Sequence, residues 1–205
     1  MKTLHLLLIT LCILFGVTQL SYGQHIAGSD HDFSGDGWSG GQICFPCHTP
    51  HNADITVAES PLWNHAVTAS SYTLYTSNTL NATMGQPSAT SKLCLSCHDG
   101  SVAIDSYGGT TGTTTIGGDA NFGTNLKKHH PISFTYNDAL ATADGGLHAP
   151  STTNSGLGSS INSDLLFGGK MECASCHDVH NGAGVSNLLR KSNSGSALCL
   201  TCHNK

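Results

Sequence analysis

The chain has 205 residues, of which 38% are hydrophobic and 6% aromatic, and its formal net charge at pH 7 is −5. This acidic balance argues against nucleic acid or anionic lipid as a partner. With 24 glycines and few aromatic side chains, the polypeptide can bury little apolar surface to offset the entropy cost of folding. The composition therefore predicts one domain whose core depends on more than its own side chains.

Residues 1–23 form a predicted secretory signal peptide. One cation, Lys2, precedes an apolar stretch over residues 4–17 that is too short to cross a bilayer comfortably, and small residues precede a cleavage point before Gln24. Cys12, the ninth cysteine, leaves with this segment. We therefore expect an exported protein, periplasmic or extracellular, and no later segment is apolar enough to span a membrane.

Four Cys-x-x-Cys-His sequences follow along the chain. Residues three and four apart share one face of a helical turn, so two thiols and an imidazole point the same way. The thiols can then form thioethers with the vinyl groups of a haem while the imidazole binds iron, which is the attachment signature of c-type haem. We expect four covalently bound haem c groups, held by Cys44, Cys47 and His48; Cys94, Cys97 and His98; Cys173, Cys176 and His177; and Cys199, Cys202 and His203.

Structural zinc and a disulfide framework are the alternatives for these cysteines. Ribbon-type zinc sites place their cysteine pairs about 15 to 20 residues apart, whereas the first cysteines here are residues 44, 94, 173 and 199. Disulfides are common in exported chains with an even number of cysteines. Neither alternative explains the histidine after all four pairs, so haem is the favoured interpretation.

The haem motifs form a pair that occurs twice. CFPCHTPHN (44–52) and CASCHDVHN (173–181) are similar, and each is followed by a second motif, LCLSCH (93–98) or LCLTCH (198–203). An internal duplication with two haems in each copy is the simplest account. We divide the tetrahaem domain, residues 24–205, into a first haem pair (about 24–100), a loop-rich lobe (about 101–169) and a second haem pair (about 170–205).

The predicted fold class is a small, mostly irregular multihaem protein with short α-helices at the haem sites, little β-structure and the haems as its core. Pro46, inside the first motif, fits only the first turn of such a helix. Within the lobe, Ile132, Phe134 and Tyr136 alternate like a short strand with one packed face. The protein without haem should be unfolded. The aromatic side chains expected to pack on the haems are Trp38, Trp63, Phe134 and Tyr136.

Each iron needs a second axial ligand, and histidine is the better candidate for it. Met84 and Met171 are the methionines that follow the signal peptide, whereas eight histidines remain besides His5 and the four in the motifs. Ligation by two histidines gives lower potentials than ligation by histidine and methionine. The eight are His25, His31, His51, His65, His129, His130, His148 and His180.

Four of these histidines are the favoured distal ligands. His51 and His180 each lie three residues after a motif histidine, so on a continuing helix both rings leave the same side. Such a residue cannot reach behind its own haem and should bind a neighbouring haem or one in an adjacent subunit. His130 precedes Pro131, which favours an extended backbone and a rigid mount. His31 lies near the new N-terminus and can reach across the first haem pair.

The other histidines are less favoured. His65, beside Trp63, is the alternative to His31. His129 should face away from His130, toward solvent. His25 and His148 lie in flexible contexts and have no expected role.

Taken together, the motifs resemble those of multihaem cytochromes with doubled CxxCH motifs. More narrowly, the chain is similar to the OmcE-type tetrahaem extracellular cytochromes of metal-reducing bacteria. The segments that carry this resemblance are HDFSG (31–35), GQICFPCHTPHNA (41–53), PLWNH (61–65), SKLCLSCHDGSVAI (91–104), HPISF (130–134) and the CASCHDVHN and LCLTCH segments near the end. The resemblance implies bis-histidine haems packed in a chain of alternating parallel and T-shaped pairs. It also implies filaments in which a histidine of one subunit completes a haem in the next, with His51 as the candidate donor and His31 as the runner-up.

Three functions are compatible with these features. The first is an electron conduit, as a subunit of a haem filament that passes electrons to external acceptors. The second is a monomeric periplasmic shuttle between a quinol oxidase and terminal reductases, and other cytochromes or redox partners are expected in both cases. The third, a multihaem reductase, needs an iron with an open position, and the surplus of histidines argues against it. No catalytic residue is expected, and a zinc-stabilised adhesin has the least support.

Overall fold

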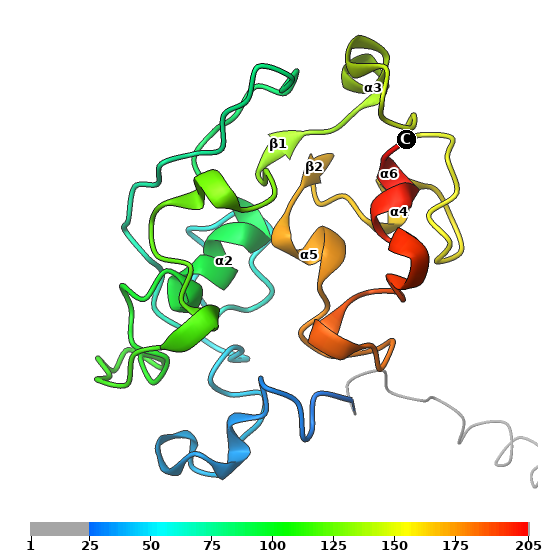
Figure 1. The fold of residues 1–205 in the computed structure, drawn as a ribbon. Coiled ribbons are helices and arrows are strands. Elements are labelled where there is room, and N and C mark those ends of the chain that lie inside the picture. The colour runs from blue at the N-terminus through cyan, green and yellow to red at the C-terminus, as the bar shows by residue number, and fades with distance from the viewer. Residues whose placement is uncertain (1–24, 205) are drawn as a thin grey trace, which may run out of the picture.

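The computed structural model describes residues 25–204, so the predicted signal peptide lies outside the described residues. Figure 1 shows a chain that is mostly loop, with short helices and one two-stranded sheet. The irregular backbone and short helices confirm the predicted fold class. In residues 25–204 no helix is long and apolar enough to cross a membrane. The helices are α2 (Ala89–His98), α3 (Asp138–Asp144), α4 (Ile161–Asp164), α5 (Cys173–Cys176) and α6 (Cys199–Cys202), and the strands are β1 (Phe134–Thr135) and β2 (Lys170–Met171).

Short 3-10 turns punctuate the loops between these elements. A side chain caps some of them, as where Asn125 accepts a hydrogen bond from the backbone N–H of Lys127. These turns are Phe33–Gly35, Gly37–Ser39, Gly118–Ala120, Leu126–Lys128, Ser186–Leu188 and Ser194–Ser196.

The sheet confirms the alternation expected in the lobe. β1 pairs antiparallel with β2, and Phe134 lies opposite Met171. Phe134 and Tyr136 are buried, whereas Thr135 between them is exposed. Because β2 ends two residues before Cys173, the pairing ties the lobe to the third haem motif.

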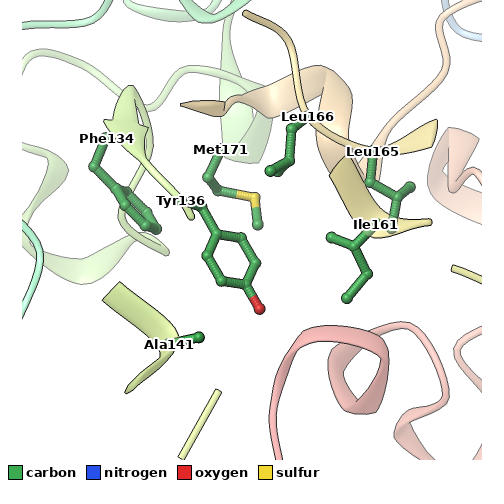
Figure 2. Packing of buried hydrophobic residues seen from close by; sticks show 7 residues of the cluster. All are labelled: Phe134, Tyr136, Ala141, Ile161, Leu165, Leu166 and Met171. Carbon is green, nitrogen blue, oxygen red and sulfur yellow. The ribbon is translucent and has the colours of Figure 1, made fainter. Parts of the chain in front are cut away.

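The larger hydrophobic cluster lies beside this sheet, between α3 and α4. Figure 2 shows Tyr136 at its centre, with Met171 on one side and Ala141 and Ile161 on the others. We expected Phe134 and Tyr136 to pack on haems, and this is wrong. The alternation turns both side chains onto α3, α4 and β2. Cys202 of the fourth motif packs against the edge of the cluster. The cluster consists of Phe134, Tyr136, Ala141, Ile161, Leu165, Leu166 and Met171.

Helix α2 is the longest of the described helices and carries the second motif in its last turn. It packs against α5, and the two lie side by side in Figure 1. Leu95 is 1% exposed and packs with Tyr72 and Leu126 in a second cluster. The helix ends before Gly100, whose φ of +72° is the left-handed conformation that glycine adopts easily after a helix. Packing of α2 on α5 brings the second and third motifs together.

Candidate functional site

Each of the four motifs forms a helical turn, as the Cys-x-x-Cys-His spacing predicts. α5 and α6 coincide with the Cys-x-x-Cys segments of the third and fourth motifs. The first motif is a single turn outside any helix, closed by a 2.9 Å hydrogen bond from His48 N to Cys44 O. Pro46, which has no N–H to donate, fits inside this turn. The eight thiols in the described residues are free, with no disulfide among them.

The helices end at the second cysteine of the third and fourth motifs. His177 has an extended backbone with φ −111° and ψ 145°, and His203 has φ −95° and ψ 132°. The expectation that His180 leaves a continuing helix on the same side as His177 is therefore wrong. His48 likewise forms a bridge with Trp63 and is not helical, so the same correction applies to His51.

Three motif histidines are held through the same ring nitrogen. Nδ1 of His48 donates to Pro61 O at 2.6 Å, Nδ1 of His98 to Ala120 O at 2.8 Å, and Nδ1 of His177 to Asn187 O at 2.9 Å. A histidine that binds a metal commonly donates its other ring N–H to a carbonyl in this way, which fixes the tautomer and the ring orientation. In these three residues Nε2 is left as the nitrogen that can bind iron.

Three motif histidines also face a second histidine ring. The ring centres are 6.1 Å apart for His48 and His180, 5.9 Å for His98 and His31, and 6.3 Å for His203 and His130. An iron between two imidazoles separates the ring centres by about 6 Å, because a metal–nitrogen bond is about 2.0 Å long and a ring nitrogen lies about 1.1 Å from the ring centre. The observed spacings therefore fit an iron atom between the two rings of each pair.

His177 and His51 remain outside these pairs. Among residues 25–204, no second histidine ring lies against the ring of His177, and the same holds for His51. His51 is exposed. Three of the four distal histidines predicted from sequence therefore lie against a motif histidine. The fourth, His51, does not, and the motif histidine His177 has no such partner among the described residues.

His65 has a different environment from the paired histidines. It is 3% exposed, with Nδ1 2.8 Å from Ala66 O and Nε2 3.0 Å from Ala103 O. Its Nε2 also lies 3.5 Å from Cys97 Sγ. Because carbonyl oxygens face both ring nitrogens, this geometry favours His31 over His65 as the partner of His98.

Two of the remaining histidines lie near haem motifs. The expectation that His129 faces solvent is wrong, because its ring is half-buried against Phe122, with ring centres 4.9 Å apart. Phe122 in turn stacks on His98 at 5.2 Å and 18°. His148 donates its backbone N–H to Cys202 O, and the exposed His25 accepts a hydrogen bond from Asn181 at its carbonyl.

His31 shows the strongest electrostatic perturbation of the described histidines. Burial, and after it the neighbouring His98, lower its pKa to about 4. Its Nδ1 is buried without a hydrogen-bond partner. A neutral imidazole with an unsatisfied buried nitrogen is the form that binds a metal, so His31 fits a ligand role next to His98.

Six of the eight motif thiols are partly buried, and burial disfavours the thiolate. Burial raises the pKa of Cys47 to about 11, that of Cys97 to about 12 and that of Cys202 to about 11. A thiol–thiol hydrogen bond between Cys94 and Cys173 raises the pKa of Cys94 well above its ordinary range and lowers that of Cys173. The first cysteines of the second and third motifs therefore touch where α2 meets α5.

Sequence reasoning missed the residues that fix these motifs. Glu172, 1% exposed, caps α5 and accepts a 2.8 Å hydrogen bond from Ser133 Oγ, while its backbone N–H donates to Ser175. Burial raises the pKa of Glu172. Arg190 donates to Ala174 O inside the third motif. An acid three residues before a serine can form a reciprocal cap, and this pattern could have indicated Glu172. No local sequence pattern indicates Arg190.

The local fold fits haem c: each motif places a free thiol pair on one turn. Three motif histidines (His48, His98 and His177) are held at Nδ1. Three (His48, His98 and His203) face a second histidine at the distance an iron requires. In residues 25–204 no group of three or more His, Cys, Asp or Glu side chains is placed to hold a metal ion by itself. The haem would be held by the two cysteines and the histidine of each motif, and at the first, second and fourth motifs also by the paired histidine.

The second half of the duplicated sequence has a recognisable family. Residues 167–205, which contain the third and fourth motifs, match the family described as Doubled CXXCH motif. No curated protein matches the chain. The segment with the third and fourth motifs is therefore similar to a family defined by paired Cys-x-x-Cys-His motifs.

Proposed function

We propose that the protein carries electrons through four haem c groups, each held by two thioethers and two histidines. The observation that supports this best is the set of three histidine pairs with ring centres 5.9–6.3 Å apart. One member of each pair belongs to a Cys-x-x-Cys-His motif and the other comes from a distant part of the chain. The proposed ligand pairs are His48 with His180 for the first haem, His98 with His31 for the second and His203 with His130 for the fourth.

Saturated irons suit electron transfer better than catalysis. Haem supplies a one-electron iron centre, and an iron with two histidine ligands has no position for a substrate. The two methionines lie elsewhere, since Met171 is buried in the core cluster and Met84 packs against it. The chain's contribution is to fix the rings, exclude water from their faces and keep the motifs close together.

The third haem obtains its second histidine from another copy of the chain. His177 is braced through Nδ1 but faces no second described histidine, while the exposed His51 is a histidine without a described ring partner. Donor and acceptor lie at different places on the chain, so the contact joins unlike surfaces. Such a contact repeats from copy to copy and builds an open filament where the rotation between copies does not close a ring. In this form the protein is an extracellular conduit to external acceptors.

A monomeric periplasmic shuttle is the alternative, and a reductase is a third possibility. Substitution of His51 separates them. The purified haem-loaded wild type should form filaments in electron micrographs and bind no carbon monoxide when reduced. His51→Ala should disperse to single chains in which one of the four reduced haems binds carbon monoxide. His25→Ala removes another exposed histidine and is the matched control, which should behave as the wild type.

Two results would contradict the filament. Dispersed wild-type chains that bind no carbon monoxide would favour the monomeric shuttle. Carbon monoxide binding by the assembled wild type would show an open iron and favour a reductase.

A further inference from the structure

The three histidine pairs differ in the angle between their ring planes. The rings of His48 and His180 are nearly parallel at 16°, those of His98 and His31 make an angle of 44°, and those of His203 and His130 are crossed at 76°. If these rings bind the first, second and fourth irons, as proposed above, the first and fourth haems have opposite ligand arrangements.

Contacts hold the rings of His48, His180 and His130. Nδ1 of His48 donates to Pro61 O, and His180 is tied to Asp178 by a 3.0 Å backbone hydrogen bond and a 3.5 Å ring contact. Nδ1 of His130 donates to Pro131 O at 2.8 Å, three residues before β1 begins. Because Pro131 restricts the backbone of His130, the crossed arrangement is built into the chain.

Ring angle affects the iron through its π-type d orbitals. Each imidazole donates into the d orbital that lies perpendicular to its own plane. Parallel rings raise the same orbital, which splits the pair of orbitals and stabilises the hole of the ferric state. Crossed rings raise both orbitals alike, so the splitting is small and the ferric state loses that stabilisation. The fourth haem is therefore the easier of the two to reduce on this count.

Charges beside the two haems act in the same direction. The Asp178 carboxylate lies 3.5 Å from Nδ1 of His180, and an anion beside a ligand makes the ligand more basic and favours ferric iron. At the other end, the Lys191 ammonium donates to Thr201 Oγ1, inside the fourth motif, at 3.0 Å and to Ser155 O at 2.7 Å. A cation fixed there favours ferrous iron.

Three acids also lie near the fourth motif. The Asp164 carboxylate accepts hydrogen bonds from Ser155 Oγ and Ser159 N and does not contact the motif. The other two act at longer range. Asp138 and Asp144 on α3 interact electrostatically with Tyr136, whose hydroxyl bonds Cys202 O. Asp138 is fully exposed to solvent and bonds Ser151, so water screens its charge. Lys191 contacts the motif itself and is half-buried, so its charge outweighs theirs.

We infer that the chain is polarised: the first haem, with near-parallel ligands and Asp178 beside it, has a lower reduction potential than the fourth, with crossed ligands and Lys191 beside it. This inference rests on the ligand pairs of the proposed function. An electron added to an isolated chain then resides at the fourth haem in preference to the first.

Electron paramagnetic resonance during a potentiometric titration of the holoprotein tests this directly. Near-parallel ligands give a rhombic low-spin signal with three resolved features, and crossed ligands give a strongly anisotropic signal with one dominant low-field feature. As the protein is reduced, the crossed-type signal should disappear at a higher potential than the rhombic signal does. Asp178→Asn should raise the potential of the rhombic species, and Lys191→Gln should lower that of the crossed-type species. Asp119→Asn and Lys92→Gln remove equal charges beside the second motif and should shift the potentials of the first and fourth haems less.

The possible failures are distinguishable. If bis-histidine low-spin signals are absent, the ligand pairs of the proposed function are wrong. If such signals are present but all of one type, or if the rhombic species is reduced first, the ligation stands and the polarity is refuted. His130→Met keeps a ligand at the fourth iron and should remove the crossed-type signal alone, which assigns that signal; its survival would refute the assignment.

Discussion

Tyr136 connects the larger hydrophobic cluster to the fourth haem motif, so Tyr136→Phe tests whether that cluster supports the site. The ring is 2% exposed, and its hydroxyl donates to His148 O at 2.7 Å and approaches Cys202 O at 3.3 Å. Phenylalanine fills the same volume, so the substitution removes hydrogen bonds without creating a large cavity. Burial raises the pKa of Tyr136, so the hydroxyl remains a neutral donor near neutral pH.

The expected cost of Tyr136→Phe follows from those two contacts. A hydrogen bond contributes about 0.5–1.5 kcal/mol net, so one good bond and one long bond together contribute about 1–2 kcal/mol. In a domain of this size that loss lowers the melting temperature by about 2–8 °C. Scanning calorimetry of the holoprotein measures the shift, and Tyr75→Phe, at a half-buried position in a loop, is the control. Equal melting temperatures for the two variants would refute the structural role of the hydroxyl.

Three further predictions concern the core, a buried acid and the second haem. Ile161→Ala, at a side chain that is 0% exposed, should lower the free energy of unfolding by about 2–5 kcal/mol in chemical denaturation; a loss below 1 kcal/mol would contradict the packing. Burial raises the folded-state pKa of Glu172, so its contribution to stability is full below its unfolded pKa and is lost as pH rises through the folded value. Wild type should therefore gain stability relative to Glu172→Gln as pH falls from neutral through that raised pKa, and a difference independent of pH would contradict this. His31→Ala should convert one of the four haems to a high-spin or water-bound form in the absorption spectrum, whereas His65→Ala should leave all four low-spin; the reverse result would make His65 the ligand.

Motif spacing predicted the local structure of the haem sites well, because three- and four-residue periodicity is a property of a single helical turn. The alternation of Phe134 and Tyr136 predicted a short strand, because side chains on a strand point alternately to its two faces. Their partners were not predictable, because the cluster around Ile161 depends on tertiary folding of a Gly- and Ser-rich segment. Composition alone therefore assigned these aromatic side chains to the haems, although they pack in protein.

Sequence also could not predict the backbone beyond each motif. The helix ends at Cys176 and the chain continues extended through His177, where bonds from Asp178 N to Leu188 O and from Arg190 N to Cys176 O replace helical ones. The two residues of each bond are ten or more positions apart in the sequence, so no local pattern predicts these bonds. For the same reason sequence could name His31, His130 and His180 as candidate ligands but could not say which motif each one faces.

The intact mass of the exported, purified protein tests the central claim most directly. Four covalently attached haems predict a mass equal to that of the processed polypeptide plus four haem groups, with no titratable thiol left among the eight motif cysteines. A mass equal to the bare polypeptide, with its thiols free, paired in disulfides or bound to zinc, would contradict the account.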